Sequence, residues 1–353
     1  MAGTTTFLLC FLLVNCSDAV VRFSSTWLYD QIDLEAAQTP LDCSKTGCYV
    51  YASLPRNRTD FEHQICIARN NACLIDLSSI AHNWDAITGA KIPFRLAAGG
   101  PYSILNMNTT VPSSSVVMYA ISKKLIDDNG FVLPIIYEPL YTQKGSFFTN
   151  RLSFMSAEPF TLTKAAVQKA TSMRIHTAGP DVFLNDDANS CFPIYVDSSH
   201  TNEAFILHVR SPFASIDIST EQKIDLELHE GVQSGTPLLT DGLTTVVTSF
   251  GFIGCMNMDT FRWRDLPNKF DLNYTAPSNN HVTLPISAYI HSNSTLSIQT
   301  DEQHLVVDSW DPNPTKFQVV YPGRWLKIIF DGSQGESFAV RISVQFSADV
   351  LGK

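Results

Sequence analysis

The chain has 353 residues, which is enough for two or three domains of ordinary size. Charged residues make up 16% of it, aromatic residues make up 11%, and the formal net charge is −10, with no cluster of Lys and Arg. Nucleic-acid binding depends on contacts between basic side chains and phosphates, so this composition excludes nucleic acid as a partner.

The first residues have the pattern of a secretory signal peptide. Residues 6–14 are an apolar run too short to span a bilayer, and Ser17-Asp18-Ala19 places small residues where a cut after Ala19 requires them. An ordinary N-terminal core segment is the alternative. We therefore predict that residues 1–19 are removed, that no transmembrane segment follows, and that the mature protein is secreted and extracellular.

Six of the eight cysteines remain after this cut. An even number of cysteines in an oxidising compartment indicates disulfide bonds. Cys191 and Cys255 are predicted to pair with each other, because the other four lie close together. A zinc site is the alternative, but no C-x-x-C spacing occurs. The four clustered cysteines leave three possible pairings: Cys43, Cys48, Cys66 and Cys73.

Short candidate strands follow one another through the first half, separated by turn residues. This spacing favours a β-sandwich over alternating strands and helices. Residues 162–175 have the best helix propensity in the chain, although they are equally readable as a linker that ends in a strand. The candidate strands are residues 20–28, 48–54, 72–77, 92–97, 102–107, 115–121 and 131–137.

The second half repeats this style. In residues 223–229 the alternation is strict, with Ile224, Leu226 and Leu228 on the predicted inward face. We therefore predict an all-β fold with little helix, made of two β-sandwich domains: a disulfide-stapled β domain at residues 20–170 and a second sandwich at residues 180–353. The candidate strands of this half are residues 192–196, 204–210, 216–218, 223–230, 243–252, 282–290, 295–300, 304–308 and 316–321.

The chain closes on a predicted hairpin. Residues 325–330 are an apolar run, residues 331–335 supply a turn, and residues 337–346 alternate between an apolar face that begins at Phe338 and a polar face. This closing sequence resembles the end of CUB and CUB-like domains, with an apolar strand, a Ser/Gly/Asp turn and a strand that opens on Phe. The resemblance implies that residues 180–353 form a CUB-like β-sandwich used for extracellular binding, which in some members is linked to innate immunity.

No catalytic residue, metal site or cofactor is predicted. Asp331-Gly-Ser-Gln-Gly335 lacks the spacing of a nucleophile elbow, and His229-Glu230 lacks the second histidine of a metalloprotease helix. His208 is expected on the polar face of its strand. Carboxylate pairs that a secreted hydrolase would need are present in the chain, although chance pairs are expected among 34 acidic residues: Asp33 and Glu35, Asp186 and Asp187, and Asp225 and Glu227.

The strongest binding candidate is Phe261-Arg-Trp-Arg-Asp265. Trp263 would offer an aromatic platform for sugar rings, or Arg262 and Arg264 a cationic pair for an acidic ligand. A core tryptophan flanked by arginines whose stems cover apolar surface is the alternative. Four glycosylation sequons begin at Asn57, Asn108, Asn273 and Asn293.

These patterns favour a secreted binding protein for an extracellular carbohydrate or protein. A secreted hydrolase acting through a carboxylate pair is one alternative, and a structural or matrix protein is another.

Overall fold

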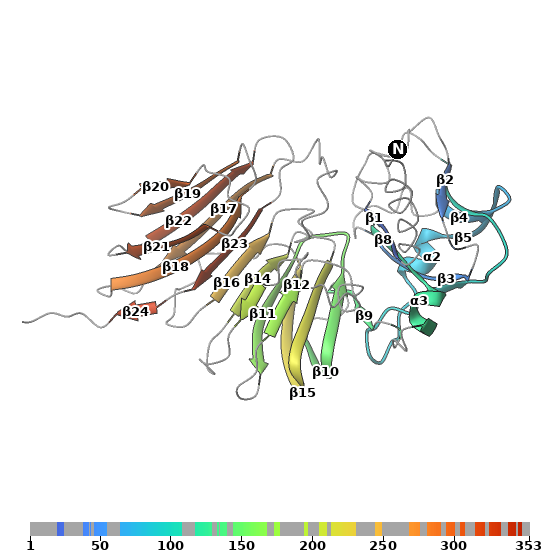
Figure 1. Cartoon of the computed structure of the whole chain (residues 1–353), viewed down its shortest axis with the longest axis horizontal. Helices are drawn as coiled ribbons and strands as arrows, with labels where there is room; N and C mark the ends of the chain where they lie inside the picture. The colour runs from blue at the N-terminus through green and yellow to red at the C-terminus, as the bar shows by residue number, and fades with distance from the viewer. Residues whose placement is uncertain are drawn as a thin grey trace, which may run out of the picture. The chain divides into compact units, whose positions relative to one another are not determined.

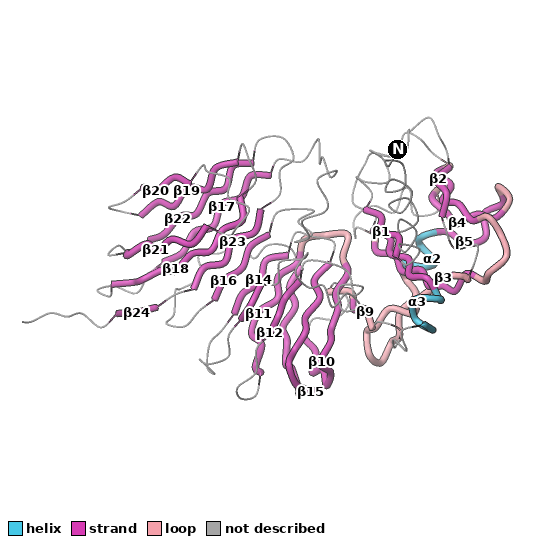
Figure 2. The backbone as a smooth tube through the Cα atoms, in the orientation of Figure 1, coloured by secondary structure: helices cyan, strands magenta, loops and turns pink. Residues whose placement is uncertain are grey.

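A computed structural model shows the chain as an all-β protein, as the sequence predicted (Figure 1, Figure 2). Two short helices occur among its described elements. Its contacts divide it into two compact units, residues 1–134 (unit 1) and 135–353 (unit 2). The structure describes residues 20–24, 38–41, 43, 46–54, 64–107, 117–128, 133, 135–139, 144–167, 173–176, 194–196, 205–209, 213–230, 244–248, 268–275, 281–290, 294–300, 304–307, 315–321, 325–332, 338–343 and 345–347.

Unit 1 contains two four-stranded antiparallel sheets, with strand orders β1-β8-β3-β6 and β2-β7-β4-β5. Buried side chains of both sheets and of helix α2 form one hydrophobic cluster, with Val50 and Met118 from the first sheet, Ile67 and Ile104 from the second, and Leu77 from α2. The elements are β1 (Val20–Ser24), β2 (Gln38–Leu41), β3 (Cys48–Ser53), β4 (Ile65–Arg69), β5 (Ala72–Asp76), α2 (Leu77–Ala81), β6 (Phe94–Leu96), β7 (Tyr102–Asn106), β8 (Val117–Ser122) and α3 (Lys123–Asp128).

Two disulfides staple unit 1, and they resolve the pairing that the sequence left open. Cys43 pairs with Cys48 and Cys66 with Cys73, at Cα–Cα distances of 5.3 and 5.8 Å. The second bridge links neighbouring strands β4 and β5. Cys191 and Cys255 lie outside the described residues, so the bridge between them stays a prediction.

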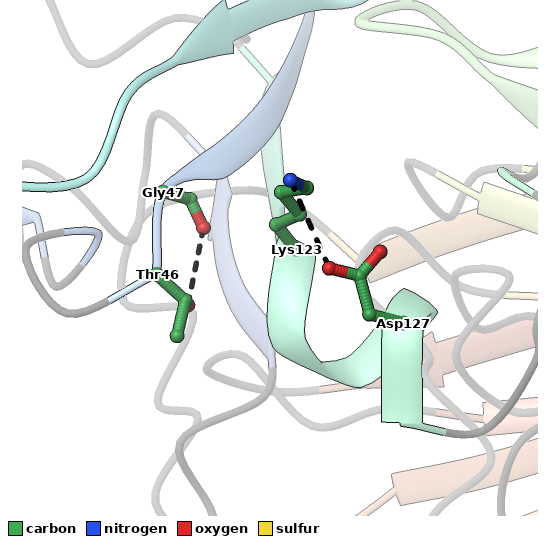
Figure 3. Close-up of polar contacts among 4 residues, drawn as sticks. All are labelled: Thr46, Gly47, Lys123 and Asp127. Carbon is green, nitrogen blue, oxygen red and sulfur yellow. Dashed lines mark hydrogen bonds and ion pairs between the residues drawn. The ribbon is translucent and has the colours of Figure 1, made fainter.

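The first disulfide closes a loop whose last turn depends on Gly47. The backbone φ of Gly47 is +83°, a left-handed conformation that favours glycine. The Gly47 N–H donates to the Cys43 carbonyl (2.9 Å), and the Gly47 carbonyl accepts from the backbone N–H of Lys123 (3.0 Å), the first residue of α3. Figure 3 shows this corner, with the Lys123 Nζ to Asp127 Oδ2 ion pair of 3.8 Å along α3.

A hydrogen-bonded loop follows α2. Asp85 Oδ1 accepts from the backbone N–H of Thr88 (2.8 Å) and of Ile87 (2.9 Å). These hydrogen bonds, that of Thr88 first, hold the pKa of the Asp85 carboxyl below its usual value, because they favour the charged form. The loop presents Ile87, which is 96% exposed.

Unit 2 contains a twelve-stranded sheet. Its strands run antiparallel to their neighbours except for two parallel pairs, β9 with β10 and β14 with β16. The bounds are β9 (Ile136–Tyr137), β10 (Lys144–Met155), β11 (Phe160–Val167), β12 (Met173–His176), β13 (Ile194–Val196), β14 (Phe205–Val209), β15 (Phe213–Glu230), β16 (Thr244–Thr248), β18 (His281–Ile290), β21 (Thr315–Tyr321), β23 (Phe338–Ser343) and β24 (Gln345–Ser347).

The long strand β15 carries the strict alternation seen in the sequence. Leu226 and Leu228 are buried, whereas Asp225, Glu227 and His229 are half-buried, which confirms the predicted faces for residues 225–229; the side chain of Ile224 lies outside the described part. The two leucines belong to the hydrophobic core that β15 shares with β10, β11, β12 and β14.

The described part of residues 162–175 contains no helix. β11 and β12 occupy it as strands of the twelve-stranded sheet, so the helix prediction is wrong there. β10 and β11 lie before the domain boundary predicted between residues 170 and 180, and they pair with β15, which lies after it. The division into two β-sandwich domains at that boundary stays a prediction.

The predicted closing hairpin is wrong in its pairing. Both strands form, but β22 (Trp325–Gly332) pairs with β17 (Asn268–Thr275) and β19 (Ser294–Thr300), whereas β23 pairs with β16 and β18 (Figure 1). The two strands therefore lie in different sheets. β22 belongs to a four-stranded antiparallel sheet of order β17-β22-β19-β20, in which β20 spans His304–Val307.

Candidate functional site

The sheet β17-β22-β19-β20 has one buried and one solvent-facing side. On β19, Leu296, Ile298 and Thr300 are buried, whereas Ser297 and Gln299 between them are half-buried. Side chains alternate along a strand, so Ser297 and Gln299 face the opposite side from the leucine and isoleucine. We call the side that carries Ser297 and Gln299 the outer face.

β22 contributes a tryptophan and a lysine to the outer face. Lys327 pairs with Gln299 across the sheet, and directly opposed residues point to the same side. Trp325 lies two residues before Lys327 and therefore shares this side. The Trp325 side chain is 42% exposed, and Lys327 is half-buried.

One row of polar residues crosses all four strands. The register pairs Asn273 of β17 with Lys327, Lys327 with Gln299, and Gln299 with His304 of β20. Neighbouring strands are spaced about 4.8 Å apart, so the row is about 14 Å long. Asn273 and His304, at its two ends, are exposed.

Hydrogen bonds hold the β19 and β20 part of the row. Ser297 Oγ lies 2.8 Å from His304 Nε2, and Gln299 Nε2 donates to Ser297 Oγ at 3.4 Å. Gln299 Nε2 also lies 3.5 Å from His304 Nε2. These contacts orient an imidazole, an amide and a hydroxyl on the paired strands β19 and β20.

This arrangement suits a polar ligand that has an apolar side. The indole of Trp325 offers a flat apolar surface, and the Lys327 ammonium beside it can donate hydrogen bonds. The amide, imidazole and hydroxyl groups of Gln299, His304 and Ser297 lie farther away on the same face and can donate or accept hydrogen bonds. Sugar rings have this mixed character, with C–H faces and hydroxyl edges. The outer face therefore carries both kinds of group that a sugar ring can contact.

The residues of the sequence-based binding site, Arg262, Trp263 and Arg264, lie outside the described part of the chain, so that site stays a prediction. Of the four sequons, Asn273 is described and is exposed on the outer face. Asn57, Asn108 and Asn293 lie outside the described residues.

One of the three carboxylate pairs is described. Asp225 and Glu227 lie side by side on the same half-buried side of β15, where Asp225 pairs with Ser146 and Glu227 with Lys144 of β10. The other two pairs, at residues 33 and 35 and at residues 186 and 187, lie outside the described residues.

Two histidines of the same sheet have hydrogen-bond partners on β11. His208, expected on a polar face, is only 2% exposed, and its Nδ1 lies 3.1 Å from Thr161 Oγ1. His229 Nε2 lies 3.0 Å from Thr163 Oγ1. Within the described residues, no three His, Cys, Asp or Glu side chains come together as a metal-binding group.

Sequence reasoning missed Trp325, because the apolar run of residues 325–330 predicts a strand that is buried along its length. One signal in the sequence could have found it. Lys327 interrupts the apolar run, so the side of the strand that carries Lys327 is the solvent side, and Trp325 shares this side by alternation.

Comparisons with known proteins assign no family. No protein-family model matches the chain, and no curated protein matches it. Among solved structures, the CUB1-EGF-CUB2 domains of rat MASP-1 are 9% identical over 60% of this chain and 100% of that one, with a TM-score of 0.17.

An uncharacterized protein of Listeria monocytogenes is 10% identical over 88% of this chain, with a TM-score of 0.19, and the match spans 29% of that protein's length. Structural likenesses this weak support neither a family nor a function for the chain. Among the described helices, none is both long and apolar enough to cross a membrane.

Proposed function

We propose that this chain is a secreted, extracellular binding protein, and that the outer face binds carbohydrate. The observation that carries the proposal is the exposed indole of Trp325 beside a row of hydrogen-bonding side chains. Exposed aromatic residues next to oriented polar groups are typical of binding surfaces. The CUB-like class for residues 180–353 remains part of the proposal. It rests on the closing sequence, whose two strands form but do not pair with each other.

A glycan array probed with the purified secreted protein tests this function. We expect Trp325→Ala to weaken binding by about tenfold or more, because loss of a stacking surface costs about 1.4 kcal/mol or more. Trp325→Phe should retain part of the affinity. Gln299→Ala should lower it as well, since a hydrogen-bonding group of the row is lost.

Two controls sharpen this experiment. Ile87→Ala removes an apolar side chain that is even more exposed but lies in unit 1, so it should leave binding unchanged. Trp263→Ala tests the site predicted from the sequence. If binding is lost with Trp263→Ala and kept with Trp325→Ala, the outer face is not the binding surface.

The innate-immunity role implied by the CUB resemblance is a narrower proposal. It predicts that microbial saccharides are the best ligands on the array. Binding confined to saccharides of the host would contradict it.

A structural or matrix role is the second candidate, favoured by β20. This strand lies at one end of its sheet in the described strand order, and its Leu305 and Val306 are exposed. Exposed edge strands can pair with another chain. Concentration-dependent association in sedimentation, abolished by Val306→Lys, would support this role, and a monomer at all concentrations would exclude it.

A further inference from the structure

The sequon at Asn273 lies on the same face as the candidate binding residues. Asn273 is exposed, and its cross-strand partner is Lys327. The third residue of the sequon, Thr275, pairs with Trp325. A glycan on Asn273 would therefore leave the sheet from the outer face, one strand away from the tryptophan.

The distances put the first sugars within reach of the indole. Cβ atoms of directly opposed residues on neighbouring antiparallel strands are about 5 Å apart, and those of diagonal neighbours are about 7 Å apart. Asn273 is opposed to Lys327 and diagonal to Trp325. The asparagine side chain and one sugar ring together bridge such a separation.

Two features favour a glycan that runs across the outer face over one that extends away from the edge of the sheet. Trp325 has an exposed apolar surface for the C–H face of a sugar, and Lys327 and Gln299 continue the row with groups that can donate to sugar hydroxyls. In the described strand order, β17 has a neighbour on one side only, β22, and this neighbour carries both Trp325 and Lys327.

We infer that an N-linked glycan on Asn273 lies across the outer face and covers Trp325. The face that would bind an external saccharide is then occupied by a saccharide of the protein itself. This consequence rests on the proposed function: glycosylation of Asn273 covers the binding face, so the form without this glycan binds external saccharides more strongly.

Hydroxyl-radical footprinting of the secreted full-length protein tests the contact without any external ligand. Three forms are compared: the native glycoprotein, the protein trimmed by an endoglycosidase to a single N-acetylglucosamine at Asn273, and Asn273→Gln. Glycopeptide mass spectrometry first establishes that Asn273 is occupied. Oxidation of Trp325 should rise in Asn273→Gln, because Trp325, which is 42% exposed in the chain itself, then loses the cover of the glycan.

The trimmed form locates the contact. If the first sugar stacks on the indole, the single N-acetylglucosamine should keep most of the protection. Trp84 in unit 1 should oxidise at the same rate in all three forms. Met155, which is fully buried in unit 2, should stay protected and so report that unit 2 is folded.

A second pair of variants separates glycan loss from damage to the fold. Thr275→Ser keeps the sequon and should keep Trp325 protected, whereas Thr275→Ala removes the sequon and should expose it. An unoccupied Asn273 in the secreted protein, or equal Trp325 oxidation with and without the glycan, would overturn the inference.

The glycan array separates this inference from the proposed function. Stronger array binding by Asn273→Gln than by the glycoprotein supports both. Array binding that needs Trp325 but does not change with the glycan sinks the inference and leaves the function standing. Protection of Trp325 by the glycan with no array binding by any form supports the inference and contradicts the proposed function.

Discussion

Replacement of Gly47 by alanine tests the account of the first disulfide loop. An added Cβ would overlap the Leu96 carbonyl oxygen and lie 3.1 Å from the Ala98 nitrogen. Both are backbone atoms, so no rotation of a side chain relieves the contact. The φ of +83° adds a second cost, because L-residues rarely adopt it.

Two other glycines separate these costs. Gly99 has a φ of +103° with no atom within 4 Å of an added Cβ, so Gly99→Ala incurs the dihedral cost alone, about 1–2 kcal/mol. At Gly100 the added Cβ would overlap the Arg69 guanidinium, the exposed end of a flexible side chain that can shift, and we expect a cost below about 1 kcal/mol. Gly47→Ala combines the dihedral cost with a backbone overlap, so we expect about 2–4 kcal/mol.

The assay is urea-dependent hydrogen exchange, read by mass spectrometry on the β3 peptide. This readout reports the opening of unit 1 separately from unit 2, which a single unfolding curve of the whole chain would not. The expected order of destabilisation is Gly47→Ala, then Gly99→Ala, then Gly100→Ala. A cost for Gly47→Ala no larger than that for Gly99→Ala would refute the steric reasoning.

Three further outcomes are expected. Thr161→Val should lower the free energy of unfolding of unit 2 by about 1–3 kcal/mol in urea, because it leaves the buried His208 ring without its hydroxyl partner; an unchanged midpoint would contradict this. The hydrogen bond from Thr88 lowers the pKa of Asp85, so the Asp85 carboxylate stabilises the loop fully above the unfolded-state pKa of about 4, and this stabilisation is lost as pH falls through the folded-state pKa. Amide exchange in the loop, corrected for intrinsic rates, should accelerate as pH falls through that value. Asp85→Ala should abolish this pH dependence. Serine replacement of both cysteines of the Cys43–Cys48 bridge should destabilise unit 1 by about 2 kcal/mol through unfolded-state entropy, again read on β3; no change would show that the loop is held by its backbone hydrogen bonds alone.

The buried and exposed faces of individual strands were easier to predict from this sequence than the strands with which they pair. In β15 the alternation of Leu226 and Leu228 with charged neighbours shows which side is buried, because hydrophobic burial acts on each side chain separately. In residues 162–175 the alanines suggested a helix, but cross-strand pairing with β15 decided for strands. Propensity is a local property, and pairing with a distant strand overrides it.

The disulfide pairing likewise depends on contacts between strands that the local sequence does not specify. Cysteine count and compartment predicted bridges in unit 1, but the choice among three pairings depends on which strands lie side by side. β4 and β5 pair as a hairpin through Asn70 and Asn71, both with positive φ, and this pairing brings Cys66 close to Cys73. Sequence spacing alone does not contain this information.

The closing strands explain why the candidate site was missed. In a hairpin, β22 would have lain beside the alternating strand that begins at Phe338, and the whole run of residues 325–330 would read as its buried partner. Instead the chain passes to another sheet after β22, so the neighbours of β22 are β17 and β19. Both carry polar residues opposite Lys327, namely Asn273 and Gln299, which makes this side of β22 the solvent side. Trp325 is exposed as a consequence, and a sequon and a hydrogen-bonded polar row meet at the same tryptophan only because the last two strands do not pair.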